Sequence, residues 1–323
     1  MKKNIYLLGL LLLAACANDD EPTGQQVQNT YPLTIEVTEN PLIPDGEEGS
    51  STRAAITTTS SLDKFYMSYG YSGDATYSNM EADKSTEGKW TTTGSWPGAG
   101  DDTEVTWYAS SISLLNESPG NAFYSNEGNP YISFSVDENA SETKDLLVAK
   151  TSGSRNGTNG NLTFNFNHAC AALRFEIKKS TNLDAYTVSV SNVKLCKVLK
   201  SAKYFWSSYT WVNYDTPTYT EYTLFNGALS NLSSTNYEAM NAANDYLFFI
   251  PQTLTAWSPT GALGNTYLEI TCTITKVSNS TVVFNDKAYI PFGATLVAGK
   301  KYDVKINIGK NSLYSAPNTK IIN

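Results

Sequence analysis

The sequence predicts an all-β protein with little helix, built as two tandem β-sandwich domains. Short segments in which apolar and polar residues alternate recur along the chain, and Gly, Pro, Asn and Asp separate them. Hardly any stretch has the spacing of about 3.6 residues that marks an amphipathic helix. A single barrel would also accommodate these strands, but the length of 323 residues favours two sandwiches.

The first sixteen residues, MKKNIYLLGLLLLAAC, are typical of a lipoprotein signal peptide. Lys2 and Lys3 form its basic start, and the apolar run that follows is too short to span a bilayer as a permanent helix. The order Leu-Ala-Ala-Cys resembles the bacterial lipobox, in which small residues admit the peptidase and the thiol accepts the lipid. We therefore predict a lipid (palmitate) on Cys16 that anchors the chain in the outer membrane; the alternative is an ordinary signal peptide with a chance Cys.

Residues 17–53 are predicted to be a tether followed by the first strand. The tether is rich in Pro, Gly, Gln and Asn and has no hydrophobic periodicity. Its acidic run, residues 19–21, is either a signal for export to the outer face of the membrane or a solvated charge run. In the stretch YPLTIEV, Leu33, Ile35 and Val37 fall on one face, which predicts a half-buried strand.

A breaker-rich loop, PLIPDGEEGSSTR, follows this strand and ends at Arg53. Arg53 is the only basic residue between Lys3 and Lys64, so it offers a single basic position in this region. A polar loop of small residues can also enter a protease cleft. A cut after Arg53 would free the upstream strand; the alternative is that Arg53 is a plain surface arginine in a linker.

Residues 54–165 and 166–323 are predicted to form the N-terminal and the C-terminal sandwich. One segment, residues 233–245, has the composition of a short helix. The predicted strands lie within residues 62–71, 89–111, 129–138, 144–151, 160–179, 185–198, 221–225, 244–254, 266–277, 281–292 and 300–309.

The charge balance and the absence of several sequence motifs narrow the range of possible functions. The net charge is −8, which argues against a nucleic-acid partner held through its phosphates. The chain contains no Gly-rich phosphate loop, zinc-protease motif or calcium loop, so we expect no enzyme activity, no cofactor and no metal site. The single histidine, His168, lies in a strand-like run and is predicted to be a hydrogen-bonded structural residue rather than a catalytic base.

Three cysteines follow Cys16, at positions 170, 196 and 272, and their spacing fits no metal site. Each lies in or beside a strand-like run, which favours buried small apolar side chains. A disulfide between two of Cys170, Cys196 and Cys272 stays open, because an exported protein can form one.

Nine aromatic residues crowd into residues 204–225. Pairing between neighbouring strands accounts for such a cluster in a sheet. Alternatively, exposed rings could stack on the apolar faces of a sugar. The candidate ligand aromatics are Trp206, Tyr209, Trp211 and Tyr214.

Several stretches in this order resemble the fimbrillin family of type V pilins, which are outer-membrane lipoproteins. They are the lipobox, TRAA at residues 52–55, DLLVA at 145–149, LTFNFNHACAALRFEI at 162–177, FFIPQ at 248–252 and GKKYDVKINI at 299–308. The resemblance covers nearly the whole chain. It implies two tandem, transthyretin-like sandwiches of Greek-key style.

The resemblance also implies how such a protein assembles. In that family an arginine-specific protease removes the N-terminal segment with its first strand, which here implies cleavage between Arg53 and Ala54. The cut leaves a hydrophobic groove, and an extended segment of the next subunit fills it. Other pilin subunits are then the partners, in a homo- or heteropolymer, and a host or bacterial surface glycan or protein is the adhesion ligand. The candidate donor strand is Tyr302, Val304, Ile306 and Ile308, or the tail that follows it. The alternative function is a monomeric surface lipoprotein that binds glycans.

Overall fold

The computed structural model describes residues 32–44, 62–71, 78–97, 102–112, 122–126, 129–240, 246–315 and 319–320. The predicted all-β class is confirmed. Within these residues helix is limited to one turn of α-helix and two 3-10 turns. They are α1 (Arg155–Thr158), η2 (Ala140–Glu142) and η3 (Thr181–Leu183).

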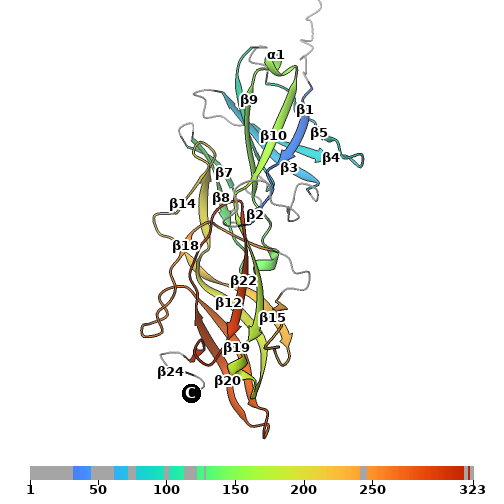
Figure 1. Cartoon of the computed structure of the whole chain (residues 1–323). Coiled ribbons are helices and arrows are strands. Elements are labelled where there is room, and N and C mark those ends of the chain that lie inside the picture. The colour runs from blue at the N-terminus through green and yellow to red at the C-terminus, as the bar shows by residue number, and fades with distance from the viewer. Residues whose placement is uncertain are drawn as a thin grey trace, which may run out of the picture.

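Seven strands close into a barrel at one end of the elongated molecule (Figure 1). Its core holds Phe65, Trp107 and Phe164, each of which is fully buried. A closed barrel leaves no unpaired edge, unlike the predicted open sandwich. In order around the barrel the strands are β1 (Thr34–Glu39), β10 (Asn161–His168), β9 (Leu147–Gly153), β6 (Val105–Ser110), β3 (Lys64–Tyr71), β4 (Ser78–Lys84) and β5 (Trp90–Thr92).

The other strands form four sheets. One has the order β16 (Glu238–Ala239), β11 (Ala171–Lys179), β22 (Lys300–Ile308) and β2 (Ile43–Pro44), and β17 (Leu247–Phe249) also pairs with β11. The largest has the order β15 (Tyr219–Leu229), β12 (Tyr186–Leu199), β19 (Tyr267–Lys276), β20 (Val282–Pro291), β23 (Tyr314–Ser315) and β24 (Thr319–Lys320). The last two are β14 (Thr210–Val212), β13 (Ser201–Phe205), β8 (Asn129–Ser135) and β7 (Ala122–Asn126), and the pair β18 (Thr253–Leu254) and β21 (Ala294–Thr295).

One large hydrophobic cluster lies between these sheets. Phe175 on β11, Val193 on β12 and Ile270 on β19 are at most 1% exposed and belong to it. Ile132 on β8 joins the same cluster, although it precedes the predicted domain boundary. The division at residue 165 is untested and stays a prediction.

The short helix predicted for residues 233–245 is wrong where the structure describes it. Glu238 and Ala239 form β16, which pairs antiparallel with β11. The backbone groups at the edge of β11 are satisfied by this pairing, and that outweighs a weak helical propensity.

Candidate functional site

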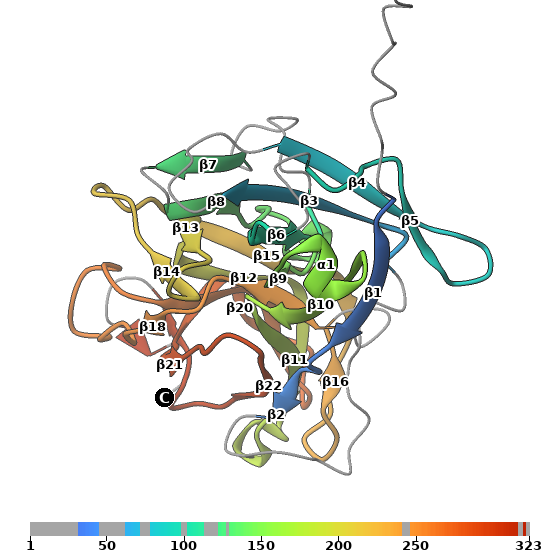
Figure 2. The same ribbon diagram turned by 90° about the horizontal axis from the view of Figure 1, so that it is seen from above.

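The first described segment, residues 32–44, connects the two parts of the molecule. β1 lies between β10 and β5 in the barrel, and β2 continues beside β22 in the next sheet (Figure 2). Leu42, between the two strands, is only 1% exposed. The amide of Asn40 donates a hydrogen bond of 2.9 Å to the carbonyl of Phe166, so the segment stays attached to β10 beyond the end of β1.

The inner face of β1 packs on an apolar floor. Leu33 and Ile35 are 9% and 6% exposed, and Val37 is half-buried. Because β1 runs parallel to β10, Ile35 lies beside Leu162 and Val37 beside Phe164. Removal of the segment would uncover this floor and the backbone edge of β10. The floor residues of β10 are Leu162, Phe164 and Phe166, at 0 to 1% exposed.

Both strands end their inward series with a polar residue. After Val37 the next inward position on β1 is Glu39, and after Phe166 the next on β10 is His168. The Nε2 atom of His168 lies 2.9 Å from Oε1 of Glu39, and its Nδ1 atom contacts a carboxylate oxygen of Asp145. The His168 side chain is 0% exposed, and the two carboxylates are 3% and 4% exposed. A buried imidazole is thus held between two buried carboxylates.

The surroundings of His168 favour its charged form. Burial by itself would lower the pKa of this imidazole, but hydrogen bonds and charges from Asp145 and Glu39 outweigh burial and raise the pKa to about 9. At neutral pH the ring is therefore an imidazolium that is hydrogen-bonded to Asp145 through one nitrogen and ion-paired with Glu39 beside the other. This agrees with the prediction that His168 is a hydrogen-bonded structural residue.

A cavity of about 520 Å³ lies next to this cluster. Asn40 and Ile43 of the first segment form one wall, and His168, Tyr209 and Lys300 contribute to the others. The first segment therefore lines the cavity as well as the barrel.

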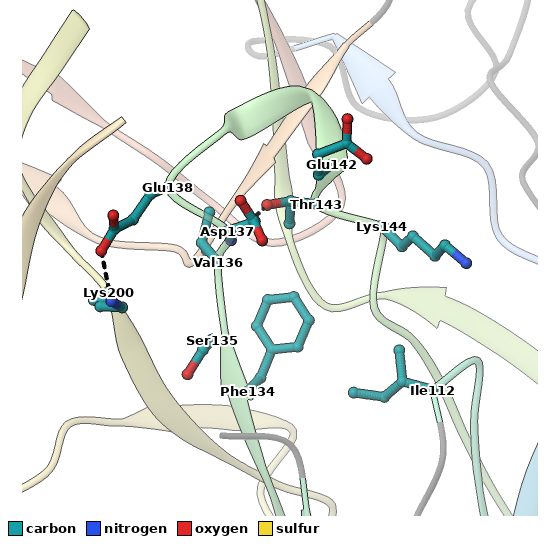
Figure 3. Close-up of a pocket in the computed structure, with 10 residues that line it drawn as sticks. All are labelled: Ile112, Phe134, Ser135, Val136, Asp137, Glu138, Glu142, Thr143, Lys144 and Lys200. Carbon is teal, nitrogen blue, oxygen red and sulfur yellow. Dashed lines mark hydrogen bonds and ion pairs between the residues drawn. The ribbon is translucent and has the colours of Figure 1, made fainter. Parts of the chain in front are cut away.

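A second cavity, of about 680 Å³, opens beside η2 (Figure 3). It carries charges of both signs, and the ammonium of Lys200 lies 2.8 Å from the Glu138 carboxylate. That hydrogen bond and charge lower the pKa of Glu138. Phe134 and Ile112 line the same space with apolar side chains.

The three described cysteines are free and buried. This matches the interpretation as small apolar side chains. Burial raises the pKa of the Cys196 and Cys272 thiols to about 12. Across the described ranges no group of His, Cys, Asp or Glu has the geometry of a metal site, and no helix is long and apolar enough to cross a membrane.

Comparison with known proteins identifies the family. A fimbrillin-like family model matches residues 52–321. The chain belongs to the fimbrillin-like family. A fimbrial protein from Bacteroides vulgatus ATCC 8482 is similar in structure, with a TM-score of 0.58 and 18% identity over 87% of this chain and 96% of that chain.

Two further solved structures resemble this fimbrillin-like chain. A candidate cell adhesion protein from Bacteroides ovatus ATCC 8483 has a TM-score of 0.49 and 14% identity, over 88% of this chain and 95% of that chain. Another candidate cell adhesion protein, from Bacteroides uniformis ATCC 8492, has a TM-score of 0.47 and 16% identity, over 90% of this chain and 96% of that chain. At these identities the likeness concerns the fold alone. The curated proteins contain no significant match.

The predicted processing residues Cys16, Arg53 and Ala54 of this fimbrillin-like protein lie outside the described residues. The candidate donor residues lie in β22, which pairs in parallel with β11 over residues 301–308. Two of them are buried and two are half-buried. They are Tyr302, Val304, Ile306 and Ile308.

The four candidate ligand aromatics do not share one surface. Trp206 is fully buried in the large cluster, and the indole N–H of half-buried Trp211 donates to the carbonyl of Ala169 at 2.7 Å. Tyr214 is half-buried below the ammonium of Lys203, whose Nζ lies 5.0 Å from the ring centre. Of the four, Tyr209 alone, 53% exposed, presents its ring to solvent.

Two residues of the cluster around His168 were missed by the sequence analysis. Glu39 could have been found, because it occupies the next same-face position after Leu33, Ile35 and Val37. Asp145 gives no such signal, since it precedes β9 outside any strand and only the fold brings it to His168.

Proposed function

We propose that this protein is a subunit of a surface fimbrium, anchored first by a lipid on Cys16 and later cut after Arg53. Removal of the N-terminal segment opens a groove, and an extended strand of another subunit fills it. The subunit then has a structural or adhesive role in attachment. The family assignment and the position of the first segment in the fold support this proposal.

The position of β1 carries the proposal. β1 is the first described strand, and it lies between β10 and β5, where it closes the barrel. Without it β10 would present both an apolar floor and unpaired N–H and C=O groups. An incoming strand satisfies both at once, because it adds main-chain hydrogen bonds and buries alternate side chains. Such head-to-tail addition extends a filament without closing it.

The packing of β22 bears on which segment is the donor. Residues 302–308 would have to leave their pairing with β11 before they could reach a neighbour. Ile308 is fully buried, so this move would expose the large cluster. We therefore favour a donor that lies after β22, while residues Tyr302 to Ile308 stay the candidate that the sequence pattern indicates.

The glycan-binding alternative receives less support. A stacking site needs at least one accessible aromatic face. Of the two tryptophans proposed for it, Trp206 is fully buried and Trp211 packs beside Phe134 and Tyr204. Of the four candidate aromatics Tyr209 is the most exposed, and the half-buried Trp211 and Tyr214 present only part of their rings.

The deciding experiment is the N-terminal residue and intact mass of the protein recovered from the cell surface. We expect a chain that starts at Ala54. Arg53→Ala should abolish this form and the polymers with it. The matched control is Arg155→Ala in α1, which should leave cleavage unchanged. A chain that starts at acylated Cys16 in wild type and variant alike would contradict the proposal.

A further inference from the structure

Glu39 belongs to the segment that the proposed maturation removes, yet its carboxylate is a buried partner of His168. The other partner, Asp145, stays with the body of the subunit because it precedes β9. Departure of the segment therefore removes one of the two carboxylates that hold the imidazolium. Any strand that refills the groove covers this position again. The residue that it places there determines whether the His168 imidazolium regains a second carboxylate partner.

We propose that the groove selects an incoming strand with a carboxylate at the position of Glu39, and that this strand comes from a different subunit. The inference rests on the proposed function. The strand it describes has apolar residues at three alternate positions and Asp or Glu at the fourth, like Leu33, Ile35, Val37 and Glu39. An apolar residue at the fourth position would leave a buried charge without its second partner.

Residues 300–323, which hold the candidate donor segments, do not offer such a strand. The same-face series of β22 runs from Lys300 through Tyr302 to Ile308 and contains no carboxylate. Residues 309–323 contain no aspartate or glutamate at all. A second copy of these segments could fill the apolar floor but could not supply the acidic side chain, which points to a different polypeptide.

Among the described residues, no other charged group replaces Glu39 at the same nitrogen. The groups that face the cluster are Asp145 on the opposite ring nitrogen, the Cys170 thiol behind Asp145, and Tyr204, Tyr209 and Lys300 around the neighbouring cavity. The ammonium of Lys300 carries the same sign as the imidazolium, and Tyr204 and Tyr209 offer hydroxyls rather than a carboxylate. A carboxylate on the strand is the group that complements this site.

The test uses peptides of residues 32–44 and the full chain cut in vitro by an arginine-specific protease. The chain carries Arg155→Lys, which leaves Arg53 and Arg174 as its arginines. Arg174 lies within β11, and its guanidinium is 2.8 Å from Asp303. Three peptides compete for the groove: the native sequence, Glu39→Gln and the control Glu36→Gln. Glu36 lies on the exposed face of the same strand, so it matches the charge change without the buried contact.

We expect the Glu39→Gln peptide to bind at least about 30-fold more weakly than the other two, because truncating one side of a buried charge pair costs about that much or more. A peptide of residues 309–323 should bind no better than Glu39→Gln. Equal binding of the native peptide and the Glu39→Gln peptide would overturn the selectivity. Binding of residues 309–323 as tightly as the native peptide would overturn the assignment to a different subunit.

A second measurement needs no cleavage. In the uncut full chain, hydrogen exchange of the amides in residues 34–39 should be faster in Glu39→Gln than in Glu36→Gln, by a similar factor, while the amides of β12 stay unchanged in both. Equal exchange in the two variants would refute the contact as a determinant of strand affinity. If Arg53 is not cut in cells, the proposed function fails. This measurement still decides whether the groove holds a strand with the carboxylate more tightly than a strand without it.

Discussion

Substitution of Ile35 by Ala should release β1 without unfolding the rest of the protein. Ile35 is 6% exposed and lies between Leu162 on β10 and Trp90 on β5. The change removes three carbon atoms, which at about 0.8 kcal/mol for each buried carbon gives roughly 2.4 kcal/mol. The cavity that remains raises the cost to about 3 kcal/mol. The opening equilibrium of β1 should therefore rise roughly 100-fold.

Native-state hydrogen exchange measures this opening directly, since local unfolding exposes only the amides of the element that opens. We expect loss of protection in residues 34–39 and none in β12, because the buried residues of β12 belong to the large cluster outside the barrel. Thr34→Ala is the matched control, because Thr34 is exposed on the same strand. Equal loss of protection in β1 and β12 would mean that β1 opens only with global unfolding, and the idea of a separable strand would then be wrong.

Three further predictions concern the buried polar groups. The pKa of His168 is raised to about 9 from an ordinary value near 6.5. Its stabilising contribution is therefore complete below about pH 6.5 and should fade as the pH rises through 9. Urea unfolding at pH 6.5, 8 and 9 should show this loss of stability, and the loss should be smaller in Glu39→Gln. With thiol pKa values of about 12, Cys196 and Cys272 should resist iodoacetamide at pH 8 in the native protein and react in urea, as peptide mass spectrometry would reveal. Tyr222→Phe should lower the free energy of unfolding by about 1–2 kcal/mol, because the buried Tyr222 hydroxyl donates to a carbonyl oxygen at 2.9 Å; an unchanged urea midpoint would contradict this.

The sequence predicts individual strands better than it predicts their partners. Alternation alone locates the strand around Ile35, because half-burial imposes a period of two. It does not reveal that β1 runs parallel to β10, which lies 127 positions further along the chain at each paired residue, or that β1 closes a barrel. Pairing of this kind depends on the whole set of strands and not on the local pattern.

The dependence on strand pairing also explains why the candidate site could be predicted only in part. The burial of Trp206 follows from parity, since Ala202, Tyr204 and Trp206 alternate on one face of β13 and its extension, and all three are buried. A count of aromatic residues that ignores which face of the strand each one occupies therefore overestimates the number of exposed rings. The contact between His168 and Asp145 has no local signal, because Asp145 lies just before β9, His168 ends β10, and the two meet only through the pairing of β9 with β10.

The cluster around His168 also bears on the register of an incoming strand. An apolar floor accepts any strand with alternating apolar residues, and it accepts that strand equally well after a shift of two positions. A shift of two would move the carboxylate away from His168 and place an apolar side chain or solvent there. The buried charge then has one partner instead of two, so the shifted register is disfavoured although the floor is still covered. In the proposed assembly, apolar burial thus supplies most of the affinity, and the single polar contact at the end of the floor defines which strand, and which register, is correct.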